Sequence, residues 1–256
     1  MKKLIFSILL LASTLLQASD IYVKPGESIA DAIRQARELR RLNDPSIEGG
    51  ITIHVAAGNY RIYEPLFLRP EDSGTPSSPT IIKGEGEVIV SGGVTVTGWK
   101  RQGKLMVADV PDFCGRPLDF RQFYVNGKKA VRARDVADFE DMYRIIRVDK
   151  QKRVLWVPAA AVRKIQKAPY AEMVLHEMWC VANLRIKDIM FAGDSAAVSF
   201  HDPESRIQFE HPWPCPMVTT DGHNSAFYLT NARELLDVPG EWYHDIRAGK
   251  LYYYPR

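Results

Sequence analysis

Residues 51–96 read ITIHVAAGNYRIYEPLFLRPEDSGTPSSPTIIKGEGEVIVSGGVTV, and this stretch decides the fold. Short runs rich in Ile, Val and Thr, with one Leu-Phe-Leu run, lie at 51–55, 66–68, 80–83, 87–90 and 94–96. Gly, Asn and Pro close most of these runs, as is typical of strands bounded by turns. No helical segment separates them, which excludes a Rossmann-like strand–helix alternation. Very short strands that follow one another closely are what a β-solenoid needs.

A helix is predicted just before this stretch. Ser28 is a good N-cap, and Asp31 three residues later completes a capping box. Apolar residues recur at helical spacing, at Ile29, Ala32, Ile33, Ala36 and Leu39. A helix with one apolar stripe is suited to cover the open end of a stack of rungs. We therefore predict an all-β solenoid with a capping helix over 28–42; a β-sandwich is the competing fold.

Beyond Trp99 the pattern changes to hairpins. Three segments combine a polar turn, a basic residue, an apolar strand and a proline, at 99–111, 147–158 and 242–255. Asn126-Gly127 is a strong signal for a two-residue hairpin turn. The prediction is a cap with the first rungs over 19–98, an antiparallel β insertion over 99–175, and resumed rungs with a further hairpin over 176–256.

The N-terminus predicts export. Lys2 and Lys3 precede a short apolar run, and small and polar residues follow as far as Ala18. This is the pattern of a secretory signal peptide, and the run is shorter than the about 20 residues that span a bilayer. We predict a signal peptide over 1–18, no transmembrane segment after cleavage, and a periplasmic, cell-surface or extracellular protein. An uncleaved anchor or a buried N-terminal helix is the alternative.

Charge and cysteine content limit the function further. The formal net charge is +3, of which Lys2 and Lys3 supply two, so that the chain after cleavage is near neutral. Nucleic-acid binding needs clustered Lys and Arg, and we predict none. The three cysteines, Cys114, Cys180 and Cys215, are odd in number and widely spaced, so they do not form a disulfide framework, although one bridge is compatible with an oxidising compartment.

Several segments carry a family resemblance. They are IADAI (29–33), VAAGNY (55–60), IVSGG (89–93) with Trp99, FRQFYVNGKKAVRAR (120–134), NARELLDVPGEWYHD (231–245) and LYYYP (251–255). Together they resemble the N-terminal regions of secreted bacterial β-helix glycoside hydrolases of the pectate-lyase-like superfamily, of the fucosidase and xylanase type. The resemblance implies a right-handed parallel β-helix and a polysaccharide or oligosaccharide ligand. In such proteins the catalytic carboxylates lie in later rungs, so it also implies a truncated relative, a gene fragment or one half of a split gene, with little activity alone. In the last case the partner is a remainder of the β-helix that is encoded downstream.

Glycoside hydrolysis needs two carboxyl groups about 5–9.5 Å apart. The candidates are Glu177 and Glu241. Glu177 lies among apolar residues, which favours a raised pKa, although an ion pair with Arg185 is the simpler interpretation. Glu241 is expected to pack or pair within a hairpin. Asp245, beside Trp242, and the pair Asp221 and His223, in a glycine-containing loop, are weaker candidates.

Aromatic and metal-ligating residues complete the candidates. Trp179, Trp213 and Trp242 are candidates for stacking on sugar rings, although most such residues belong to a core. His176-Glu177 lacks the second histidine of a zinc-protease motif, because Cys180 occupies that position. No cofactor or metal is predicted.

Three classes of function remain. The first is a glycoside hydrolase that acts on a glycan. The second is a non-catalytic β-helix module that binds glycan. The third is a polysaccharide lyase, which requires a Lys or Arg base beside contacts for an acidic sugar, often with Ca²⁺; no such cluster is visible in the sequence.

Overall fold

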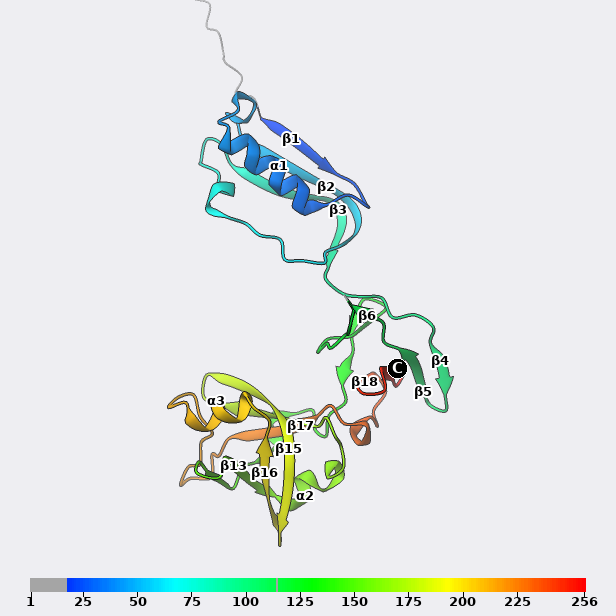
Figure 1. Ribbon diagram of the computed structural model, residues 1–256, viewed down its shortest axis with the longest axis vertical. Helices are drawn as coiled ribbons and strands as arrows, with labels where there is room; N and C mark the ends of the chain where they lie inside the picture. Colours follow the sequence, from blue (N-terminus) through cyan, green and yellow to red (C-terminus); the bar gives the residue numbers. More distant parts are fainter. Residues whose placement is uncertain (1–17, 114) are drawn as a thin grey trace, which may run out of the picture. The chain divides into compact units, whose positions relative to one another are not determined.

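The computed structural model describes residues 18–113 and 115–256 (Figure 1). The predicted signal peptide lies outside these residues, apart from Ala18. The chain divides into two compact units, residues 1–95 and 96–256, called unit 1 and unit 2. Within the described ranges, no helix has the length and apolar character needed to cross a membrane.

Unit 1 is a small parallel sheet covered by one helix (Figure 1). The strand order is β1 (Ser19–Val23), β2 (Ile51–Arg61) and β3 (Thr80–Ser91), with all neighbours parallel. The predicted helix is confirmed as α1 (Ile29–Arg41), and the Ser28 hydroxyl accepts from the Asp31 amide at 3.2 Å. Its apolar stripe packs on alternating residues of β1 and β2, such as Val23 and Ile53. Two 3₁₀ helices, η1 (Pro45–Ile47) and η2 (Pro70–Asp72), lie in the connections.

The predicted right-handed parallel β-helix is wrong. Parallel pairing is present between β2 and β3, but the described part of unit 1 forms one sheet of three strands and not a succession of rungs. The runs at 80–83 and 87–90 belong to the single strand β3, and those at 66–68 and 94–96 lie in no strand. Gly84-Glu85-Gly86 is therefore not a turn. It faces a register shift between Ala56 and Gly58, as in a β-bulge.

Unit 2 is built on a curled antiparallel sheet of seven strands (Figure 1). Their order is β11 (Tyr143–Arg144), β17 (Ala226–Thr230), β14 (Glu172–Glu177), β15 (Cys180–Ala192), β16 (Ser195–Phe200), β13 (Val154–Pro158) and β12 (Arg147–Asp149). The edge strands β11 and β12 follow one another in the chain. The Ile145 amide donates to the Ser225 carbonyl at 3.1 Å, and the Ile146 amide donates to the Trp156 carbonyl at 2.7 Å. Segment 143–149 therefore joins the two edges of the sheet.

The core of unit 2 lies inside this curl. Alternate residues such as Met173, Leu175 and Leu229 point inward and are fully or almost fully buried. The predicted rungs at 184–190 and 197–200 are wrong, because these segments are antiparallel neighbours in β15 and β16. The alternation of hydrophobic residues in these two segments marks the inner face of a curled antiparallel sheet and not the rungs of a solenoid.

A second sheet of unit 2 has the order β10 (Val131–Arg132), β18 (Glu241–Asp245), β19 (Lys250–Tyr253), β5 (Leu105–Asp109) and β4 (Lys100–Gln102). Small hairpins join β6 (Asp112–Phe113) to β7 (Arg116–Pro117) and β8 (Tyr124–Val125) to β9 (Lys128–Lys129). The helices are α2 (Ala159–Val162), α3 (Glu204–Glu210), η3 (Phe139–Asp141), η4 (Arg163–Ile165) and η5 (Arg233–Leu235). All four predicted hairpins are confirmed by pairing of β4 with β5, β8 with β9, β12 with β13 and β18 with β19.

Candidate functional site

The outer face of the curled sheet forms the floor of a pocket. Because strand residues alternate, Glu172 and Val174 point away from the core that Met173 and Leu175 enter. The strand register places Asn183, Val174 and Tyr228 in one cross-strand row, and Arg185, Glu172 and Thr230 in the next. Residues of both rows line a pocket of about 360 Å³.

The wall of this pocket is basic. It is supplied by Arg121, Lys129, Arg132 and Arg134, which lie on the segment between β7 and β11. Backbone contacts fix this segment: β10 pairs with β18, and the Ala133 amide donates to the Trp242 carbonyl at 2.8 Å. An isolated bridge between Arg134 and Thr230 then places the segment beside β17.

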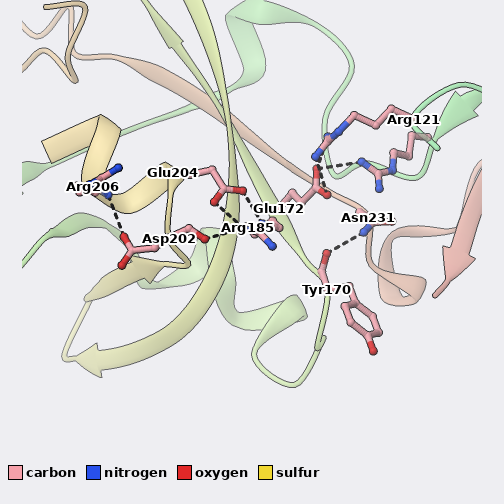
Figure 2. A network of polar contacts seen from close by, with 9 residues as sticks. Arg121, Tyr170, Glu172, Arg185, Asp202, Glu204, Arg206 and Asn231 are labelled. Atoms are coloured by element: carbon pink, nitrogen blue, oxygen red, sulfur yellow. Dashed lines mark hydrogen bonds and ion pairs between the residues drawn. The ribbon is translucent and has the colours of Figure 1, made fainter. Parts of the chain in front are cut away.

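Glu172 joins the wall to the floor (Figure 2). Its buried carboxylate accepts two hydrogen bonds from the Arg121 guanidinium, at 2.6 and 3.2 Å, and one from Arg132 Nη1 at 2.9 Å. The Arg132 side chain is only 12% exposed and lies 5.6 Å from the centre of the Trp242 ring. Burial lowers the pKa of Arg132, and the Glu172 charge acts in the opposite direction. The Glu172 carboxylate thus neutralises the charge of the Arg132 guanidinium, which is largely removed from water.

Two cations of the wall have no such partner. Among the described residues, the Arg134 guanidinium and the Lys129 ammonium form no hydrogen bond and no ion pair. The Arg134 guanidinium lies 6.0 Å from the centre of the Tyr228 ring. Burial raises the pKa of Tyr228, and Arg134 acts against that shift. The pocket therefore combines an aromatic ring, the exposed amide of Asn183 and cationic groups that are available to a ligand.

The arginine on the next row is engaged elsewhere. Arg185 donates to Glu204 Oε2 at 2.7 Å and to the Asp202 carbonyl at 2.8 Å (Figure 2). Its ion pair with Glu204 shows that the interpretation in which it pairs with Glu177 is wrong. In the same region, the Asn231 amide donates to the Tyr170 carbonyl at 2.8 Å and fixes the chain just before β14.

Glu177 lies at the far end of β14, on the strand face that enters the core. The Cys180 thiol donates to its carboxylate at 3.0 Å, and the Gln208 amide of α3 donates to its other oxygen. Burial raises the pKa of Glu177, as the apolar neighbours in the sequence suggested. Burial and the adjacent Glu177 raise the pKa of Cys180 to about 11.

Glu241 is a buried backbone acceptor. It accepts from the amides of Val238 at 3.1 Å, Asp237 at 3.2 Å and Arg134 at 3.4 Å. Burial raises its pKa, and these hydrogen bonds act in the opposite direction. The carboxylate thereby holds the loop before β18 against the segment that carries the basic wall.

Glu177 and Glu241 do not lie together. Glu241 contacts Arg134, which bridges to Thr230, and Thr230 pairs with Glu172. Glu177 is five residues further along β14, which is about 16 Å at about 3.3 Å per residue. Glu177 and Glu241 are thus held near opposite ends of β14 and share no hydrogen-bond donor among the described residues, unlike the close carboxyl pair of a glycosidase.

The three candidate tryptophans differ in accessibility. Trp179 is 82% exposed at the tip of the β14–β15 hairpin, with a φ of +71°, and Trp213 is 53% exposed. Trp242 is fully buried, and its ring stacks on Phe120 at 5.2 Å between centroids. The rings of Trp179 and Trp213 are therefore accessible to solvent, whereas Trp242 is a core residue.

The weaker candidates lie in turns. Asp221 and His223 form an exposed pair at 3.1 Å, and hydrogen bonds from Thr219 and His223 lower the pKa of Asp221 to about 2. Asp245 accepts from the Ala248 amide in the β18–β19 turn. Over 18–113 and 115–256, no cluster of three or more His, Cys, Asp and Glu side chains has the arrangement of a metal site. Cys180 and Cys215 are both free thiols.

The basic wall is absent from the site residues that the sequence predicted. Its signal was present in the segment KKAVRAR (128–134), which carries four cations in seven residues. Because the segment is partly extended, Arg132 and Arg134 fall on the same side. The floor residues Asn183 and Tyr228 gave no local signal, because they meet only through strand pairing.

The comparisons with known proteins identify the class of this chain as carbohydrate-active and give its family. The family model for the GH141 insertion domain matches residues 103–256. The chain therefore belongs to this family of glycoside hydrolases. A solved structure described as a glycoside hydrolase is similar with 62% sequence identity and a TM-score of 0.83.

The match to that structure covers 93% of this chain and 43% of the other. The chain thus spans less than half the length of that glycoside hydrolase. The comparison with curated proteins finds no match. The resemblance to glycoside hydrolases is confirmed by these findings, whereas membership of the pectate-lyase-like β-helix superfamily is not supported.

Proposed function

We propose that this chain is the glycan-binding part of an exported glycoside hydrolase, and that unit 2 binds the polysaccharide at the pocket on its curled sheet. The pocket carries the proposal, because it presents a tyrosine ring, an exposed amide and two unpaired cations on one rigid surface. Sugars are commonly held by an aromatic face with hydrogen-bonding groups at the edge. The pocket also lies within the residues that match the family model.

Binding is the role that the described carboxylates favour over hydrolysis by this chain alone. Glu177 and Glu241 are held near opposite ends of β14, which spans about 16 Å from Glu172 to Glu177. Each is also held by donors that are part of the fold, namely Gln208 and Cys180 for the first and backbone amides for the second. We expect little or no turnover of aryl-glycosides or polysaccharides by the chain. Robust turnover that is lost in Glu177→Gln or Glu241→Gln would contradict this expectation.

The binding test is calorimetric titration of the chain with a panel of neutral and acidic plant oligosaccharides. Tyr228→Ala should weaken binding about tenfold or more, because an aromatic contact and its desolvation are lost. Tyr124→Ala is the matched control, since this exposed tyrosine lies on the β8–β9 hairpin outside the pocket lining. Equal binding by the wild type and Tyr228→Ala would refute the proposed site. Trp179→Ala tests whether the hairpin tip adds a second contact.

Export is the remaining part of the proposal and rests on the sequence of residues 1–18. We expect the mature protein to begin within a few residues of Ser19, in the periplasm, at the cell surface or outside the cell. N-terminal sequencing of the protein from its native host tests this. An intact Met1 in the cytoplasmic fraction would contradict it.

A further inference from the structure

The pocket on the curled sheet has an excess of positive charge. Four cationic side chains line it, at Arg121, Lys129, Arg132 and Arg134. The carboxylate in direct contact with them is Glu172, which is buried and already shared by Arg121 and Arg132. Among the described residues, the Lys129 and Arg134 side chains form no ion pair, although the Glu241 carboxylate accepts from the Arg134 backbone amide.

Other acids nearby do not cancel this excess. Asp119 is near enough to stabilise the Arg132 charge, but no ion pair joins the two. Asp135 uses its Oδ1 to accept from the Leu229 amide at 2.8 Å, and burial raises its pKa. Neither residue lines the pocket.

Further positive charge lies beyond one end of the floor. His176 is the next outward-facing residue of β14 after Val174, and its ring lies 6.1 Å from Tyr228. Phe139 packs edge-on against His176 at 5.5 Å, and the Arg144 guanidinium lies 4.6 Å from the Phe139 ring. The acidic residues of η3, Glu140 and Asp141, are exposed on this side. The cation at this end is Arg144, because burial and the Arg144 charge lower the pKa of His176 and favour its neutral form.

We infer that this pocket binds an acidic sugar, that is, a polysaccharide residue carrying a carboxylate or a sulfate. Arg134 and Lys129 contact the anionic group, and the Tyr228 ring packs against the sugar ring. The inference rests on the proposed glycan-binding function and names its ligand class. A guanidinium presents paired N–H donors that match the oxygens of a carboxylate or sulfate, and an ammonium adds a point charge. The uncharged floor of Val174 and Tyr228 distinguishes this ligand from a free anion, which needs no apolar surface.

The test uses the full chain and a pair of ligands that differ only in charge. Oligogalacturonate and its fully methyl-esterified form have the same sugar and linkage, so that their affinities isolate the contribution of the carboxylates. We expect the acid form to bind about tenfold more tightly at low salt, because a hydrogen bond to a charged group exceeds a neutral one by about that factor. Heparosan oligosaccharides, which carry carboxylates, and dextran sulfate extend the panel to a second uronate and to sulfate.

The decisive variant is Lys129→Gln/Arg134→Gln. It should lose most of the preference for the acid form, so that the acid and the methyl ester bind with similar affinity. Lys150→Gln/Lys152→Gln is the matched control, because it removes the same charge from the β12–β13 turn, outside the pocket. Circular dichroism and urea unfolding establish that both variants fold.

The outcomes separate the inference from the proposed function. Binding of the acid form alone, or of dextran sulfate alone, supports the inference and assigns the anionic group. Equal binding of acid and ester, with both lost in Tyr228→Ala, overturns the inference while the glycan site stands. No binding of any oligosaccharide overturns both. Equally tight binding of single-stranded DNA, lost in the same double variant, would show a general polyanion site and also overturn the inference.

Discussion

Replacement of Glu172 by alanine should destabilise unit 2 by about 3–5 kcal/mol, which is the cost of breaking a buried ion pair by removing one partner. The carboxylate is buried and accepts from Arg121 and Arg132. Without it, Arg132 keeps a charge that is 12% exposed and has no other carboxylate in contact among the described residues. Arg121 is half exposed and turns to water at little cost. Most of the loss therefore comes from Arg132.

The assay is urea unfolding followed by tryptophan fluorescence. All five tryptophans lie at or beyond position 99, so the signal reports on unit 2. With a slope of roughly 2 kcal/mol per molar urea, the expected loss lowers the midpoint by about 1.5–2.5 M. Glu204→Ala is the matched control, because its ion pair with the half-exposed Arg185 is worth about 0–1 kcal/mol.

A double variant separates desolvation from simple loss of contact. Glu172→Ala/Arg132→Met removes the buried charge together with its partner and should recover a large part of the lost stability. If Glu172→Ala costs no more than Glu204→Ala, or if the double variant is no more stable than the single one, the reasoning about the buried guanidinium is refuted.

Glu241→Ala should cost about 1–3 kcal/mol in the same assay, because the Val238 and Arg134 amides lose an acceptor, whereas the Asp237 amide keeps its bond to the Leu235 carbonyl; a loss below about 1 kcal/mol would argue against that role. Hydrogen bonds that the His54 ring donates to Glu85 and then to Asp20 raise the pKa of His54, so its contribution to stability is present below the ordinary pKa and declines as the pH rises through the raised value. NMR titration of His54 should show that raised pKa, and a midpoint at or below about 6.5 would contradict the contacts. With a pKa of about 11, Cys180 should react with iodoacetamide at pH 8 much more slowly in the folded than in the unfolded protein, in a variant whose other cysteines are serine. Glu177→Gln should accelerate that reaction, and an unchanged rate would show that Glu177 does not raise the pKa of Cys180.

Local signals in the sequence were sufficient for the helix and the hairpins. The Ser28 cap and the apolar spacing from Ile29 to Leu39 defined α1 to within a residue or two. Asn126 and Gly127 both adopt positive φ, as a two-residue hairpin turn requires. Each of these features depends on residues that are close in the chain, so the physical cause is visible in the sequence.

The overall fold depended on information that the sequence does not display. A glycine pair such as Gly84 and Gly86 permits either a turn between two strands or a bulge within one, and the choice depends on the partner strand. Similarly, β15 pairs with β14 through its first half and with β16 through its second half. No local pattern reveals that one strand serves two neighbours, and this property produces the curl in place of a stack of rungs.

The sequence indicates the buried carboxylates but not the pocket, for the same physical reason. The pKa of a carboxylate inside an apolar run, such as Glu177, is raised by burial, and the apolar neighbours that bury it are adjacent in the sequence. The pocket instead brings Arg134, Asn183 and Tyr228 together from three segments, and its character depends on which cations are already neutralised.

Glu172 sets the charge of the pocket as well as the stability of the sheet. It occupies Arg121 and Arg132 and holds them at the end of the floor. A single buried carboxylate cannot neutralise all four cations, so Lys129 and Arg134 repel one another and the fixed arginines across the pocket. In the proposed acidic-sugar complex, the anionic group of the ligand supplies the opposite charge and lowers this repulsion. The fold would then leave to the ligand the counter-charge that no ion pair among the described residues gives Lys129 and Arg134.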